Sequence, residues 1–284
     1  MEIIKPLKEI SFDKMFEAFS EAFKDYEVQL TKEELQTMLQ RRGFVPELSF
    51  GLFIDDQLIS FTCNGIGSFN GIKTAYDTGT GTIKEYRGQG HASKIFSHSL
   101  PFLKEAGVSR YLLEVLQHNT KAVSIYKKLG FKVDREFNYF LEKTENIRFC
   151  SKITNSGYQI EQIDLSHIDL MSDFRDFNPS WQNSFEAIRR KPQDFKMMGV
   201  FEGQKLLGYC VLEPNTGDVT QIAVDKHYRR RGIGTLLLKE TQKFNLHDSV
   251  KVINTDVNCE SITGFLQANS IPLRGKQFEM TKQL

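Results

Sequence analysis

The chain has 284 residues, which suits two domains of roughly 140 residues better than one hydrophobic core. Its 37 lysines and arginines balance 36 aspartates and glutamates, so we expect no nucleic-acid partner. No apolar run reaches the roughly 18 residues of a membrane span, and the first residues lack a signal-peptide layout, so we expect a cytoplasmic protein. The four cysteines are far apart, which predicts free thiols and no metal site.

Two copies of one pattern follow each other along the chain, about 140 residues apart. Each copy begins with a short strand-like run and a helix-rich stretch, at residues 2–40 and 158–190. Each continues with a hairpin signal, in which apolar runs flank Asp55-Asp56-Gln57 and Glu202-Gly203-Gln204. We place the copies at residues 1–145 and 154–284, with a polar linker between them.

The next shared feature is a strand that runs through a basic, glycine-containing loop into a helix, at residues 80–96 and 221–238. Loop amides and the positive end of a helix converge on one small volume, which favours an anion. Glycine lets the backbone approach a phosphate, and arginine adds a permanent charge. The loops are Arg87, Gly88, Gln89, Gly90, His91 and Ala92 in the first copy, and Arg229, Arg230, Arg231, Gly232, Ile233 and Gly234 in the second.

The last shared feature is an apolar strand that ends at an asparagine and opens a helix, at residues 110–131 and 250–271. Asn119 and Asn258 are the predicted N-caps of these helices. Seven residues after Asn119 the first copy has Tyr126, whereas the second copy has Phe265 at the matching position. The second copy therefore lacks a hydroxyl that the first copy carries.

These motifs resemble the GNAT superfamily of acetyl-CoA-dependent N-acetyltransferases, and the resemblance covers both copies in tandem. The family's loop pattern is matched by Arg87, Gly90 and Ala92 and by Arg229, Gly232 and Gly234, and its later motif by Asn119, Ala122, Tyr126, Leu129, Gly130 and Phe131. The resemblance implies an α/β fold of two domains. Each would have a mixed, mostly antiparallel sheet that splays at the CoA site and is flanked by helices.

The resemblance also implies roles for particular residues. The loop amides would bind the pyrophosphate of CoA, Asn119 and Asn258 would contact the pantetheine region, and the strand edges along pantetheine would be Thr82 and Ile83, and Ala223 and Val224. Tyr126 would protonate the departing thiolate, because a phenol pKa near 10 exceeds a thiol pKa of about 8.5. A helix N-cap alone would also explain Asn119, and a core aromatic would explain Tyr126.

An amine must lose a proton before it attacks a thioester, so a base or a water chain is needed. Glu114 and Asp77 are the candidate bases, although for either one alone an ordinary solvated carboxylate is the preferred interpretation. Tyr26, Asn64 and Asp77 are expected at the acceptor site from their location alone.

We therefore expect an enzyme, an acyl-CoA-dependent N-acetyltransferase. It would move an acetyl group from acetyl-CoA to an amine by direct attack, with its main active site in the first copy. The second copy would bind CoA and either not turn over or use another acid. The alternative is a CoA-binding sensor with weak or no catalysis. A further alternative is a structural or interaction protein that keeps the fold but binds no CoA. Small-molecule and peptide amines are both open as acceptors, as are acyl length and oligomeric state.

Overall fold

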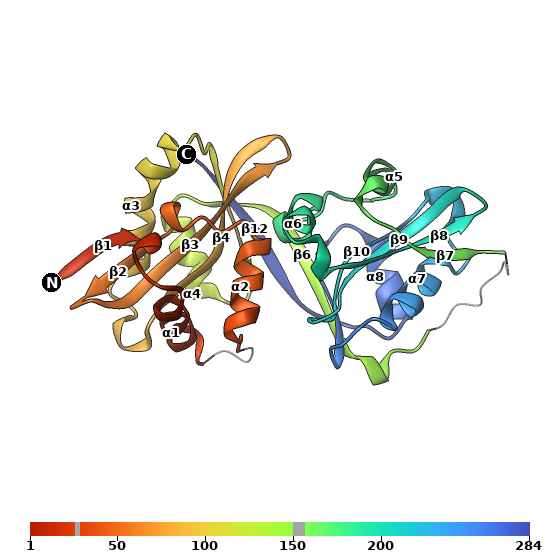
Figure 1. Cartoon of the computed structure of the whole chain (residues 1–284), viewed down its shortest axis with the longest axis horizontal. Helices are drawn as coiled ribbons and strands as arrows, with labels where there is room; N and C mark the ends of the chain where they lie inside the picture. The colour runs from red at the N-terminus through yellow and green to blue at the C-terminus, as the bar shows by residue number, and fades with distance from the viewer. Residues whose placement is uncertain (26–28, 150–156) are drawn as a thin grey trace. The chain divides into compact units, whose positions relative to one another are not determined.

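The computed structural model describes residues 1–25, 29–149 and 157–284. These residues form two compact units, which we call unit 1 (Met1–Asp134 with Glu279–Leu284) and unit 2 (Arg135–Phe278). Each unit is built on a mixed sheet with helices on both faces (Figure 1). No helix in the described ranges is long and apolar enough to cross a membrane.

Unit 1 contains the predicted order of elements, with the strands in the sheet order β1-β2-β3-β4-β5. The hairpin turns at Asp55 and Asp56, whose φ values of 47° and 64° suit the twist of a tight two-residue turn. The elements are β1 (Glu2–Pro6), η1 (Leu7–Glu9), α1 (Phe12–Phe23), α2 (Lys32–Arg41), η2 (Pro46–Leu48), β2 (Phe50–Ile54), β3 (Gln57–Phe69), β4 (Ile72–Thr82), η3 (Lys84–Tyr86), α3 (His91–Glu105), β5 (Arg110–Leu116) and α4 (Thr120–Lys128).

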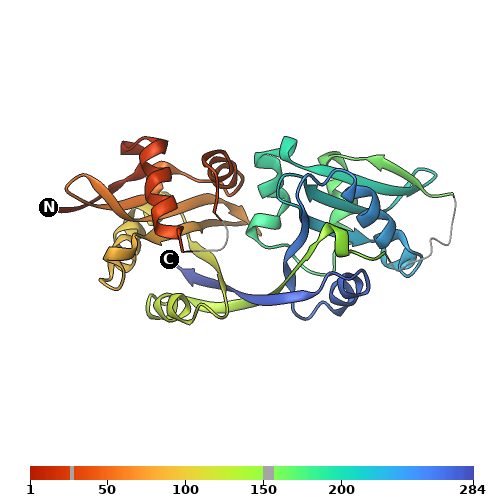
Figure 2. The same ribbon diagram turned by 90° about the horizontal axis from the view of Figure 1, so that it is seen from below.

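The core of unit 1 has two layers because successive residues of a strand point to opposite faces of the sheet. Phe61 and Cys63 of β3 face α1 and α2. Ile59 would share their face in a regular strand, but the register with β2 shifts at this residue, and Ile59 packs with Phe50 and Leu52 under α3. In Figure 2, the red helices α1 and α2 lie on one side of the sheet and the yellow α3 lies on the other. Both faces of the sheet are therefore covered, and the site can form only where its strands separate.

Unit 2 repeats this plan, with the sheet order β6-β11-β10-β9-β8-β7. Helices α7 and α8 cover one face, where Val200 and Leu212 are buried, and α5 and α6 cover the other, where Met197 and Val211 are buried. The elements are β6 (Lys132–Lys143), η4 (Thr144–Asn146), β7 (Gln159–Gln162), η5 (Leu165–His167), α5 (Ile168–Asp173), η6 (Trp181–Asn183), α6 (Phe185–Arg190), η7 (Pro192–Asp194), β8 (Lys196–Glu202), β9 (Lys205–Glu213), β10 (Asp218–Val224), η8 (Lys226–Tyr228), α7 (Ile233–Gln242), β11 (Ser249–Asp256), α8 (Glu260–Ala268) and β12 (Leu273–Gln283).

The two parallel strands in the middle of each sheet pair briefly and then separate. In unit 1 the ladder between β4 and β5 ends at Tyr76 and Leu112. In unit 2 the ladder between β10 and β11 consists of Asp218 and Lys251. Most other neighbouring strands pair antiparallel. The predicted fold class, two α/β domains with splayed and mostly antiparallel sheets, is confirmed.

The units exchange their last strands. β6 follows α4 of unit 1, but from Arg135 onward it belongs to unit 2, where it pairs antiparallel with β11. β12 follows α8 of unit 2, but its end belongs to unit 1, where the Leu284 amide donates to the Ser109 carbonyl over 2.9 Å. The boundaries at residues 145 and 154 describe the copies in the sequence and stay a prediction, whereas the compact units divide within β6 and β12.

Candidate active site

The glycine loop of unit 1 lies between the free end of β4 and the start of α3. Gly88 and Gly90 both have φ of 80°, a left-handed conformation that favours glycine. A Cβ atom built on either residue would meet nothing within 4 Å, so the space in front of the loop is open. The first amides of α3, which begins at His91, have no acceptor within the helix. Loop and helix thus offer amides to an anion.

The loop of unit 2 has the same backbone with a different sequence. Gly232, which precedes α7 at Ile233, has φ of 84° and matches Gly90. Arg230 matches Gly88 and has φ of 64°, although it is not a glycine. A left-handed non-glycine residue is strained by roughly 1–2 kcal/mol. Such strain in a loop is typical of functional sites, where other contacts hold the conformation in place.

The arginine that opens the unit 1 loop binds the protein itself. Arg87 donates from Nε to the Thr82 carbonyl at 3.1 Å and from Nη2 to the Ala22 carbonyl at 2.8 Å. Its Nη1 also contacts Asp25 Oδ2 at 3.4 Å. Arg87 therefore holds the loop against the end of β4 and the last turn of α1, and the loop amides face the open space.

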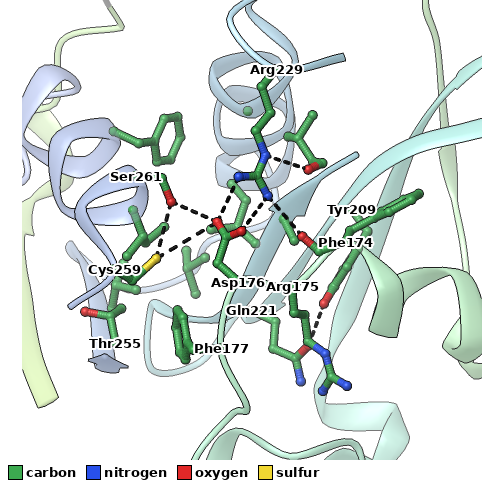
Figure 3. Close-up of a pocket in the computed structure, with 18 of the residues that line it drawn as sticks. Phe174, Arg175, Asp176, Phe177, Tyr209, Gln221, Arg229, Thr255, Cys259 and Ser261 are labelled. Carbon is green, nitrogen blue, oxygen red and sulfur yellow. Dashed lines mark hydrogen bonds and ion pairs between the residues drawn. The ribbon is translucent and has the colours of Figure 1, made fainter. Parts of the chain in front are cut away.

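The matching arginine of unit 2 makes an equivalent set of contacts. Arg229 donates from Nε to the Val224 carbonyl at 3.0 Å and from Nη2 to the Phe174 carbonyl at 3.2 Å. Its Nη1 pairs with Asp176 Oδ2 at 2.9 Å. Ser261 of α8 donates to the same carboxylate at 2.8 Å (Figure 3). Partial burial works against the charge of Asp176, but the bonds from Arg229 and Ser261 outweigh it and lower the pKa of that carboxyl.

Asp176 was not predicted from the sequence. It follows the early helices of the second copy, as Asp25 follows α1 in the first, so an alignment of these stretches would have indicated it. The other basic residue of the loop, Arg231, lies with its guanidinium 4.9 Å from the centre of the Tyr228 ring and donates to the His227 carbonyl.

Tyr126 and Asp77 meet where β4 and β5 separate. The Tyr126 hydroxyl donates to Asp77 Oδ2 at 3.1 Å. Asp77 also accepts from the Thr80 hydroxyl at 2.9 Å and from the Gly79 amide at 3.0 Å. Burial raises the pKa of Asp77 above its ordinary value of 3.8, and these hydrogen bonds offset only part of that rise. A half-buried carboxyl with a raised pKa beside a phenol can exchange protons with it.

Other predicted residues of unit 1 surround this pair. Asn64 lies opposite Asp77 in the β3–β4 ladder, accepts a hydrogen bond from the Tyr111 hydroxyl and donates to the Leu48 carbonyl at 2.6 Å. Glu114 of β5 interacts with the Tyr76 hydroxyl, and its charge adds to burial in raising the pKa of Tyr76. The structure brings Asn64, Asp77 and Tyr126 into one cluster. Tyr26 lies outside the described residues.

The two predicted N-caps differ. Asn119 is the N-cap of α4, and its Oδ1 accepts from the Ala122 amide at 3.2 Å, as expected. The prediction for Asn258 is wrong, because Cys259 is the N-cap of α8 and makes no capping bond from its side chain. The Asn258 side chain donates to Asp256 instead, at 3.1 Å. The Asn258 backbone amide donates to the same Asp256 oxygen at 2.9 Å, so this turn ties the asparagine to the end of β11.

The remaining predicted residues lie along the strand ends and loops. Thr82 ends β4 and shares a hydrogen bond of 2.7 Å with Ser60, and the Ile83 amide donates to the Ile59 carbonyl. Ala223 and Val224 end β10 and pair with β9. His91 is buried, and within the described residues neither of its ring nitrogens has a hydrogen-bond partner. Gln89 and Ala92 follow the path of the unit 1 loop into α3.

Unit 2 contains a cavity of about 510 Å³ in front of its loop. It is lined by Gly232, Ile233 and Gly234 of the loop, by the free ends of β10 and β11, and by Phe265 of α8. Phe265 occupies the position of Tyr126, and a Cβ atom on Gly234 would approach its ring to 3.1 Å. The cavity therefore has the anion-binding loop of unit 1 but an apolar ring in place of the phenol.

Each unit thus combines a splayed mixed sheet with an amide-lined loop at a helix N-terminus, which suits a phosphate-bearing ligand. The family model "Acetyltransferase (GNAT) family" matches residues 12–131 and 159–260. The chain belongs to this family and is an acyl-CoA-dependent N-acetyltransferase. The predicted resemblance to the GNAT superfamily is confirmed for both copies.

Two curated relatives share part of the chain. An N-alpha-acetyltransferase 30 of Schizosaccharomyces pombe is 33% identical over 106 residues, which cover 37% of this chain and 71% of the relative. An N-alpha-acetyltransferase MAK3 of Arabidopsis thaliana is 27% identical over 104 residues, which cover 36% of this chain and 55% of the relative. Each relative thus matches only about a third of the chain.

Solved structures match the whole chain in fold. A tandem GNAT protein from the clavulanic acid biosynthesis pathway has a TM-score of 0.76 at 11% identity, and the match covers 100% of this chain and 98% of that one. A GCN5-related N-acetyltransferase from Sphaerobacter thermophilus has a TM-score of 0.73 at 10% identity, covering 99% and 95%. The tandem arrangement is therefore shared over the full length.

Proposed function

We propose that this protein transfers an acetyl group from acetyl-CoA to an amine, and that the transfer takes place in unit 1. The observation that carries the proposal is the hydrogen bond of 3.1 Å from the Tyr126 hydroxyl to Asp77. It puts a proton donor and a proton acceptor in contact where β4 and β5 separate. The second unit has Phe265 instead and lacks that donor.

Binding of the acyl donor rests on the two loops. The amides around Gly88 and Gly90 face open space, and the start of α3 adds the positive end of a helix dipole. The pyrophosphate of CoA fits such a site by charge and by its many acceptor oxygens. The thioester end would then run along the gap between the strands toward Tyr126.

The residues of unit 1 allow a balanced proton path. The amine nitrogen attacks the thioester carbon and gives its proton to Asp77, whose raised pKa suits a base. When the carbon–sulfur bond breaks, Tyr126 gives its proton to the departing sulfur. The proton on Asp77 then passes to the Tyr126 oxygen over the existing hydrogen bond. The products are an amide and free CoA thiol, and both side chains return to their starting states.

Unit 2 is proposed to bind CoA in its cavity without the same catalysis. Its loop amides and Arg230 supply the anion site, but the phenylalanine ring of Phe265 cannot protonate a thiolate. The names of the two curated relatives point to α-amino groups as the first acceptors to test. The alternative function, a CoA-binding sensor, predicts binding at both loops and no turnover.

The test measures thiol release from acetyl-CoA with peptides and small molecules that carry α-amino groups, followed by other primary amines. Tyr126→Phe keeps the ring and removes the proton, and we expect kcat to fall about 100-fold or more with unchanged CoA affinity. Gly90→Val and Gly232→Val are a matched pair, because the φ values of 80° and 84° disfavour valine equally in the two loops.

We expect Gly90→Val to lower turnover more than Gly232→Val does. Turnover that resists Tyr126→Phe and Gly90→Val but is lost in Gly232→Val would move the active site to unit 2. Clear CoA binding by the unmodified protein without thiol release from any amine would favour the sensor.

A further inference from the structure

The cavity of unit 2 has a second basic group away from its loop. Arg175 lines this cavity together with Tyr209 and Gln221. In Figure 3, Arg175 lies beside Gln221 in the lower part of the view, and the loop arginine Arg229 lies at the top. The proposed binding of CoA uses the part of the cavity next to the loop and gives Arg175 no role.

The side chain of Arg175 is held in place but keeps most of its donors. Its Nε donates to the Ser172 carbonyl at 3.2 Å, and its guanidinium lies 5.2 Å from the centre of the Phe185 ring. In the described ranges no carboxylate forms an ion pair with Arg175. Its neighbour in sequence, Asp176, is paired with Arg229. A partly buried guanidinium without a counter-charge favours an anionic ligand.

The polar groups around Arg175 are already satisfied by one another. The Tyr209 hydroxyl donates to Gln221 Oε1 at 2.7 Å, and Gln221 Nε2 donates to the Asn183 carbonyl at 2.6 Å. Burial raises the pKa of Tyr209, so its hydroxyl is neutral and supplies no negative charge. This chain fixes the wall of the cavity, and the terminal nitrogens of Arg175 are left to meet a ligand.

We propose that the cavity of unit 2 binds a small molecule that carries a carboxylate, which the guanidinium of Arg175 recognises. A guanidinium offers two parallel N–H donors to the two oxygens of a carboxylate. The carboxylate can belong to an amino acid, or to a dicarboxylic acyl group on CoA. The second source rests on the proposed binding of CoA by unit 2, whereas the first does not.

The experiment measures binding by calorimetry with the full chain, so that it does not depend on turnover. One arm titrates glycine and leucine against their α-carboxamides, in which a neutral amide replaces the carboxylate next to the α-amine. The other arm titrates succinyl-CoA against butyryl-CoA, which has the same chain length without the charge. Arg175→Gln removes the charge and keeps hydrogen-bonding groups. Arg189→Gln on the exposed face of α6 is the control for a lost positive charge.

We expect the carboxylate of at least one pair to bind more tightly, and Arg175→Gln to weaken that binding about tenfold or more. The neutral partner and the Arg189→Gln protein should be unaffected. A preference in the first arm assigns the carboxylate to an amino acid, and a preference in the second assigns it to the acyl group. No preference in either arm, or a preference that survives Arg175→Gln in a folded protein, overturns the proposal. The folded state is checked by thermal melting and by retained CoA binding.

Discussion

The Tyr126 hydroxyl donates a hydrogen bond of 3.1 Å to Asp77, which is 49 positions earlier in the chain. The phenol comes from α4 and the carboxyl from β4, so the contact exists only because the fold brings the helix to the free end of that strand. Asp77 is half-buried and its pKa is raised, and the phenol is one of its partners. Together they form a proton pair that neither residue provides alone.

This pair predicts how the reaction depends on pH. A base works only when deprotonated, so kcat/KM should rise as pH rises through the raised pKa of Asp77 and then level off. Asp77→Asn removes the base, and we expect it to lower kcat about 100-fold and to abolish this acid limb. The measurement is a pH profile of thiol release for both proteins.

Glu114→Gln is the control for this profile, because Glu114 is the other carboxylate predicted as a base. It interacts with the Tyr76 hydroxyl, whereas the Tyr126 hydroxyl donates to Asp77. We expect Glu114→Gln to keep the acid limb. If Glu114→Gln loses the limb and Asp77→Asn keeps it, the two roles are reversed.

Asp77 also has a predicted effect on stability. Below pH 3.8 the carboxyl is protonated both in the folded and in the unfolded chain, and its ionisation costs nothing. Above that value the unfolded chain loses the proton first, so the folded state is progressively disfavoured until the raised pKa is passed. Denaturant unfolding of wild type and Asp77→Asn should therefore show the wild type losing stability relative to the variant as pH rises. A difference that is constant with pH contradicts this.

The sequence predicted the features that depend only on the local order of residues. The loops, the N-cap at Asn119 and the position of Tyr126 follow from the spacing of glycine, asparagine and aromatic residues. The contact between Asp77 and Tyr126 could not be derived, because it depends on how far β4 and β5 separate. The exchange of β6 and β12 was equally hidden, since both strands follow equivalent helices and either sheet could accept them. Arg175 was missed because the sequence does not show that its neighbour Asp176 pairs with Arg229, a contact that only the folded chain reveals.

The strained Arg230 allows charge and backbone to be separated. Arg230→Ala and Arg230→Gly remove the same charge, but φ of 64° disfavours alanine and not glycine. We expect the glycine variant to be more stable than the alanine variant by about 1 kcal/mol in denaturant unfolding. Both should weaken CoA binding by unit 2 to the same extent if the charge of Arg230 contributes. Equal stability of the two variants would show that the loop relaxes.

The contact between Gly234 and Phe265 predicts a coupling between two positions. A Cβ atom on Gly234 would approach the Phe265 ring to 3.1 Å, which is tighter than an ordinary contact. We expect Gly234→Ala to destabilise the wild type by about 1 kcal/mol. In the Phe265→Ala background the same change should be stabilising by about 0.5 kcal/mol or more, because alanine favours a helix over glycine. A double-mutant cycle measures the difference. Additive effects would mean that the ring moves aside freely.

The two asparagines give the last prediction, in which equal sequence positions have unequal effects. Asn119 caps α4 through the Ala122 amide, so Asn119→Ala should destabilise unit 1 by about 1 kcal/mol. Asn258 donates to Asp256 and caps no helix, so Asn258→Ala should cost clearly less. Denaturant unfolding of the two variants, each compared with wild type, makes the measurement. If Asn258→Ala lowers the free energy of unfolding as much as Asn119→Ala does, the turn before α8 stabilises the fold in its own way. The two asparagines would then differ in their contacts but contribute equally to stability.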